Sequence, residues 1–120
     1  MRKLKTANPE AIELIRFLRK QSRENDAPIW RDIAERLAKP KRKRTAVNVS
    51  RLNRYTEKNQ TVVIPGKVLG TGEINHPITV TAFALSRKAE EKINAASGKL
   101  LSFADLVKRN PKGSHIKIIG

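Results

Sequence analysis

The stretch Pro77–Gly98, PITVTAFALSRKAEEKINAASG, predicts a strand followed directly by a helix. Residues 78–85 contain several β-branched side chains and no breaker, and Pro77 stands at the entrance, where a strand tolerates proline. The outward-facing threonines of this segment are only mildly polar, so we expect both faces of the strand to be covered. Ser86 opens the following helix, and Gly98 suits a left-handed residue at its end.

Short strands and helices continue upstream of this unit. Residues 61–64 are a β-branched run that predicts a strand, ended by a turn at Pro65-Gly66. Residues 68–69 predict another short strand. Earlier in the chain, alternation predicts a strand at 47–49, and residues 50–58 predict a short helix or helical turn.

The downstream segment repeats the alternation. Ser102 and Asp105 have the spacing of a capping box and predict a short helix. Residues 116–119 are rich in isoleucine and predict the last strand. Strands that alternate with helices indicate an α/β core.

Two amphipathic helices precede this core. The first begins at Asn8, which can cap a helix, with Pro9 at the first helical position, and it runs about five turns to a break at 25–28. The second has one apolar face, made of Trp30, Ile33, Ala34 and Leu37. We expect the two helices to pack as a hairpin, and we interpret Trp30 and Phe103 as core anchors rather than base-stacking platforms.

The predicted fold class is therefore α/β with an N-terminal helical extension. A chain of 120 residues is expected to form a single compact unit. Within it we distinguish a helical hairpin extension at 1–38, a basic connector at 39–60 and the α/β core at 61–120.

Charge restricts the class of partner. Lys and Arg number 26 and Asp and Glu number 11, a net charge of +15. Such an excess repels itself, and a polyanion removes the repulsion and releases counterions, so nucleic acid is the leading partner. The basic N-terminus is followed by no apolar signal region, and no apolar run is long enough to span a bilayer. The absence of cysteine excludes disulfides and thiolate chemistry and fits a cytosolic protein.

The basic connector is the strongest functional signal. Residues 39–58 contain eight cations and one acid, a net charge of +7. Arginine can bind phosphate through two parallel N–H bonds, and lysine adds a point charge. The alternative is a solvated charge run or a localisation signal.

The glycine-rich stretch 66–72 resembles a phosphate loop only superficially. It lacks the Gly-Lys-Ser/Thr that opens a helix in a P-loop, and it lacks the third glycine of a dinucleotide fingerprint. The glycines are expected to permit positive φ in tight turns. Another interpretation is that these turns bring backbone N–H groups near RNA phosphates.

No set of residues predicts catalysis. His76 and His115 have no partner at metal-ligand spacing, and the carboxylates are spread thinly along the chain. We therefore predict no enzyme activity, no metal site and no cofactor.

Two stretches carry a family resemblance. They are Val47–Tyr55, VNVSRLNRY, followed by Val62–Gly72, VVIPGKVLGTG, and the match continues through Ile78–Ser86 and the next helix. This pattern, which covers nearly the whole chain, resembles archaeal and eukaryotic large-subunit ribosomal protein eighteen, and its later part is similar to bacterial large-subunit protein fifteen. The resemblance implies irregular strand-strand-helix turns wound into a short superhelix. It also implies a non-catalytic, structural role on the cytoplasmic ribosome, packed against folded ribosomal RNA and neighbouring proteins.

The positions carried over from the motif are expected to lie near RNA: Asn48, Ser50, Arg51, Asn53, Arg54 and Lys67. Charge and loop placement add Arg2, Lys3, Lys5, Lys41, Arg42, Lys43, Arg44, Lys58, Lys112 and His115. We expect contacts mostly to phosphates and 2′-hydroxyls, with little base reading. The alternative is a DNA-binding chromatin or regulatory protein, because the helix pair resembles a helix-turn-helix and charge does not separate DNA from RNA.

Overall fold

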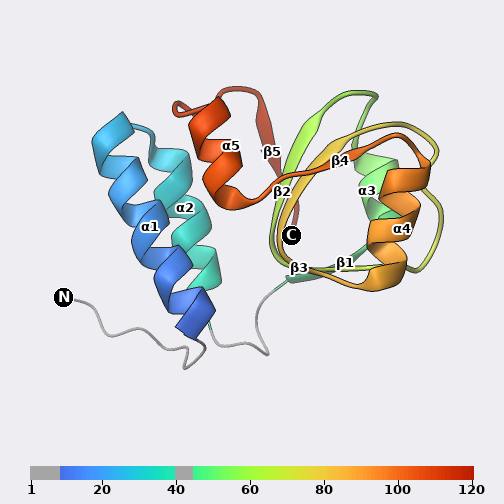
Figure 1. The fold of residues 1–120 in the computed structure, drawn as a ribbon, viewed down its shortest axis with the longest axis horizontal. Helices are drawn as coiled ribbons and strands as arrows, with labels where there is room; N and C mark the ends of the chain where they lie inside the picture. Colours follow the sequence, from blue (N-terminus) through green and yellow to red (C-terminus); the bar gives the residue numbers. More distant parts are fainter. Residues whose placement is uncertain (1–8, 40–44) are drawn as a thin grey trace.

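A parallel sheet with helices on both faces forms the molecule (Figure 1). The computed structural model describes residues 9–39 and 45–120. On one side of the sheet lie α1 (Pro9–Asn25), α2 (Pro28–Leu37) and α5 (Phe103–Arg109). On the other side lie α3 (Val49–Tyr55) and α4 (Arg87–Ala95). The α/β class and the N-terminal helical segment are confirmed, whereas the expected cap Asn8 lies outside the described residues.

Every strand pair in the described sheet is parallel. The order is β1-β2-β3-β4, with β5 also paired to β2. The strands are β1 (Thr45–Asn48), β2 (Thr61–Leu69), β3 (Thr79–Leu85), β4 (Lys99–Leu100) and β5 (Ile116–Ile118). Because β3 follows one edge of β2, the other edge is shared: β5 pairs with its first residues and β1 with its last. The carboxyl ends of β1, β2 and β3 therefore lie at the same edge of the sheet.

The expected turn at Pro65-Gly66 is wrong, since β2 runs unbroken through it. Proline supplies no N–H, but the register against β3 shifts between Ile64 and Lys67, and a bulge tolerates proline. On the opposite edge, Pro65 lies between the pairing with β5 and the pairing with β1. A Cβ on Gly66 would lie 2.0 Å from the Thr45 carbonyl oxygen, so glycine permits the close approach of β1.

The helix ends confirm the two predicted serine caps and correct the predicted left-handed residue after α4. The hydroxyl of Ser86 accepts a hydrogen bond from the Ala89 N–H at 3.2 Å, and that of Ser102 accepts one from the Asp105 N–H at 3.1 Å. The left-handed residue after α4 is Ser97, with φ of 64°, and not Gly98. A Cβ on Gly98 would lie 2.8 Å from the Ile78 carbonyl oxygen, so this glycine is needed for contact with the neighbouring chain segment.

One strand boundary and one additional strand also differ from the sequence prediction. Val49 begins α3 instead of ending a strand. The two-residue strand β4 was not predicted, because so short a segment has no periodicity of its own.

Two apolar clusters lie on opposite faces of the sheet. Val62 and Ile64 of β2 pack with α3 and α4, whereas Val63 between them packs with the α1–α2 hairpin and α5. Trp30 is fully buried in the second cluster, and its indole Nε1–H donates to the Pro111 carbonyl at 2.7 Å. Phe103 lies in the same cluster, so both are core anchors as predicted. The expected coverage of both faces of the strand at 78–85 is confirmed for β3. Val80 belongs to the cluster with α3 and α4, whereas Thr81 is fully buried and Phe83 packs against the cluster on the hairpin side.

Candidate nucleic-acid interface

Helix α3 presents two of the described basic residues of the connector, Arg51 and Arg54. Val49 and Leu52 are fully buried against the sheet, which leaves Arg51 and Arg54 exposed on the outer face. A short amphipathic helix therefore displays two guanidinium groups on a rigid support. Guanidinium groups suit phosphate because their donors match its oxygens.

The start of α3 lies against the glycine turn, residues 70–72, which follows β2. The Ser50 N–H donates to the Thr71 carbonyl at 3.3 Å. Gly72 has φ of +91°, and a Cβ there would lie 2.3 Å from the Ser50 Cβ. The predicted use of glycine for a positive φ is thus confirmed at Gly72. Asn48, half-buried at the end of β1, is the residue before this helix.

Lys92 of α4 holds the glycine turn from the other side. Its ammonium donates to the carbonyls of Gly70 and Gly72 and lies 3.6 Å from the Glu73 carboxylate. The carbonyls of Gly70 and Gly72 therefore face this lysine, whereas that of Thr71 faces α3. Nothing in the residue pattern of the chain pointed to Lys92, because the contact joins segments about twenty residues apart.

Asn53, Thr56 and His76 fix the loop after the turn, and of these only Thr56 carried no signal in the sequence. The Asn53 Oδ1 accepts from the Asn75 N–H at 3.1 Å. The Thr56 hydroxyl donates to the Leu52 carbonyl at 2.5 Å, so it accepts from the His76 Nε2–H at 2.7 Å. Asn53 and His76 thus have positioning roles within the protein, whatever else they contact.

The other described candidates lie apart from one another. Lys58 is exposed in the turn after α3, and Lys67 is the exposed residue of the otherwise covered strand β2. The Lys112 ammonium donates to the Asn25 carbonyl at 2.6 Å, which places it at the end of α1. His115 is exposed just before β5, with φ of 60°. The structure thus groups Asn48, Ser50, Arg51 and the glycine turn, but not Lys112.

Several predicted contacts fall outside the described residues: Arg2, Lys3, Lys5, Lys41, Arg42, Lys43 and Arg44. They remain predictions from charge and from the family resemblance.

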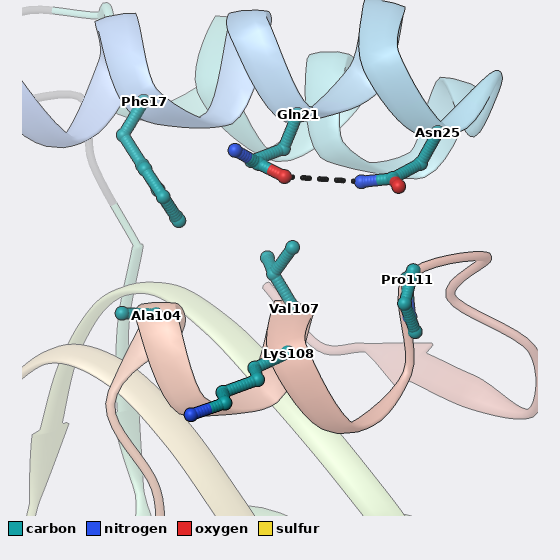
Figure 2. A pocket seen from close by; sticks show the side chains of 7 residues that line it. All are labelled: Phe17, Gln21, Asn25, Ala104, Val107, Lys108 and Pro111. Atoms are coloured by element: carbon teal, nitrogen blue, oxygen red, sulfur yellow. Dashed lines mark hydrogen bonds between the residues drawn. The ribbon is translucent and has the colours of Figure 1, made fainter.

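A groove lies between α1 and α5 (Figure 2). Its volume is about 310 Å³, and Phe17 and Val107 point into it from opposite sides. The Asn25 amide donates to Gln21 Oε1 at 3.1 Å along its rim, and Lys108 is the one charged residue among those that line it. This lining supplies no acid–base pair.

Other site classes find no support in residues 9–39 and 45–120. No three His, Cys, Asp or Glu side chains in these ranges gather in a way that could hold a metal ion. Separately, none of the described helices combines the length and apolar character that a bilayer crossing requires.

Helix α2 presents one exposed arginine, Arg31, and not a row of donors such as a DNA-reading helix carries. Its Arg36 bonds to Asp32 at 3.3 Å and to the Gly120 carbonyl at 3.0 Å. Glu35 of the same helix pairs with Arg19 at 3.0 Å. A recognition helix instead directs its donors outward to base edges.

Fold and charge together define a class: a basic α/β protein whose exposed cations suit a polyanion. Residues 1–119 match the family described as ribosomal protein 60S L18 and 50S L18e. The chain is 45% identical over 119 residues to large ribosomal subunit protein eL18 of Methanococcus maripaludis, covering 99% of each chain. It is also 45% identical to the eL18 protein of Methanothermobacter thermautotrophicus, over 99% of this chain and 98% of that one. The chain belongs to this family, and the resemblance found in its sequence is confirmed.

Proposed function

We propose that this chain is a structural, non-enzymatic component of the large ribosomal subunit in the cytoplasm. Its partners are folded large-subunit ribosomal RNA and neighbouring ribosomal proteins. The observation that carries this proposal is the family match across residues 1–119, with relatives named as large ribosomal subunit proteins at 45% identity.

Electrostatics and shape support RNA as the direct partner. The net charge of +15 is far larger than a domain of this size needs for solubility. The exposed cations Arg51, Arg54, Lys58 and Lys67 stand on or beside regular elements whose other faces are buried. Such a support holds cations in place, so phosphates can be neutralised at little entropic cost. Structured RNA offers the matching lattice of phosphates and 2′-hydroxyls.

The first test is where the chain sediments in a sucrose gradient of lysate from its native host. At high magnesium we expect it with intact ribosomes, and at low magnesium with the separated large subunit. Sedimentation as free protein, or with chromatin, at both magnesium concentrations would contradict the proposal. The small subunit's proteins in the same gradient serve as the control for subunit separation.

A further inference from the structure

We propose that Tyr55 is a stacking site for one unpaired RNA base, supported by the cations around it. The inference rests on the proposed function and adds a mode of recognition to it. Tyr55 is 49% exposed and is the one exposed large apolar side chain in residues 9–39 and 45–120. The other aromatic residues in these ranges are buried or half-buried.

The backbone that carries this ring is fixed on both sides. Leu52, one turn earlier in α3, is fully buried, and the next residue, Thr56, is only 7% exposed. The Thr56 hydroxyl is bonded to both the Leu52 carbonyl and His76. From β5, the Lys117 ammonium donates to the Tyr55 carbonyl at 2.5 Å. An exposed ring on so rigid a base loses little conformational freedom when a ligand stacks on it.

The charges around the ring favour a nucleotide over a protein partner. The Arg51 guanidinium carbon lies 5.9 Å from the ring centroid. Arg54 precedes Tyr55, Lys58 follows three residues later, and Lys117 bonds to its backbone, against one nearby acid, Glu57. A protein-docking surface would show a contiguous apolar patch, whereas this ring stands alone among cations. A nucleotide offers the π-face of its base to the ring, while the backbone phosphates on either side of it meet the cations.

One exposed ring accepts one base, so the site does not make the protein a single-strand binder. Stacking does not depend on base identity, and it does not neutralise a phosphate. Loss of the ring should therefore weaken binding without changing its salt dependence. Loss of a neighbouring arginine should also weaken binding, but it should in addition reduce the slope of the salt dependence.

The test measures binding of the full chain to refolded large-subunit ribosomal RNA of the host over a salt series. For Tyr55→Leu, which keeps an apolar side chain, we expect affinity to fall about 5- to 100-fold at every salt concentration, with an unchanged slope. Tyr55→Phe should bind as the unmodified chain does, because the ring remains. Arg54→Gln is the matched control on the same helix and should reduce the slope by about one unit.

Unchanged affinity of Tyr55→Leu would overturn the stacking site. So would an equal loss in Tyr55→Phe, since that would assign the effect to the hydroxyl. If Tyr55→Leu binds RNA normally but enters subunits poorly, the ring contacts a protein and the inference is wrong. If the unmodified chain shows no salt-dependent RNA binding, the proposed function itself fails. Fluorescence of the buried Trp30 reports whether each variant is folded.

Discussion

Gly66 and Gly72 show how single residues constrain the fold through their neighbours. At Gly66 the backbone of β1 comes so close that a Cβ would lie 2.0 Å from the Thr45 carbonyl oxygen. At Gly72 the constraint is double, because φ is +91° and the Ser50 side chain fills the space. The positive φ was predicted from the sequence, but the close contact at each glycine was not, since its partner lies about twenty positions away.

We predict that Gly66→Ala destabilises the protein by about 3 kcal/mol, since the added methyl group must push β1 away from β2. The free energy of unfolding from urea denaturation, followed by circular dichroism, measures this. The neighbouring substitution Lys67→Ala, at an exposed position of the same strand, should change stability by less than about 0.5 kcal/mol. Equal stability of Gly66→Ala and the unmodified chain would mean that β1 does not lie so close to β2.

At the scale of elements, α3 combines packing and presentation of charge within seven residues. Val49 and Leu52 fix it to the sheet, while Arg51, Arg54 and Tyr55 face solvent. The part of the connector that precedes β1 adds four consecutive cations, Lys41 to Arg44.

The basic run of the connector can be tested separately from α3. Replacing Arg42, Lys43 and Arg44 together with Ala should weaken RNA binding and flatten its salt dependence, by about one unit of slope for each phosphate that the variant no longer neutralises. Binding over a salt series, with folding checked by circular dichroism, measures both effects. An unchanged slope would show that this run does not bind phosphate. Replacing three exposed cations of α1, Arg16, Lys20 and Arg23, together with Ala removes the same charge and provides the matched control.

At the scale of the whole molecule, the helical hairpin is docked onto the sheet. Val63 of β2 shares an apolar cluster with α1, α2 and α5. The loop before β5 reinforces the contact, through the Pro111 carbonyl bonded to Trp30 and through Lys112 bonded to the end of α1. The hairpin and the sheet should therefore unfold together, because neither can lose its partner without exposing this cluster.

We predict a single unfolding transition, with Trp30 fluorescence and far-ultraviolet circular dichroism coinciding. Trp30→Ala should cost about 3–5 kcal/mol of stability, since it leaves a large cavity between hairpin and sheet. Tyr55→Ala, which removes an exposed aromatic ring, should cost far less. Two separate transitions in the unmodified chain would show instead that the hairpin folds independently.

The sequence by itself determined the features that are local or periodic. Pro9 opens a helix, Ser86 and Ser102 cap two others, and the apolar face around Trp30 is buried. Each of these depends on residues within a few positions, so the pattern is visible in the chain. The net charge and the residue pattern that indicates the family can likewise be read from the sequence without knowledge of the fold.

Only the tertiary structure decided where chain segments meet. It continued β2 through Pro65-Gly66, where the sequence predicted a turn, because β5 pairs with β2 before this point and β1 pairs with β2 after it. It placed the left-handed residue at Ser97, because Gly98 is needed for close contact with Ile78. It brought Lys92 to the glycine turn and left the Tyr55 ring exposed among cations. The physical reason is the same each time: the deciding partner lies far away in sequence, and only the assembled sheet brings it close.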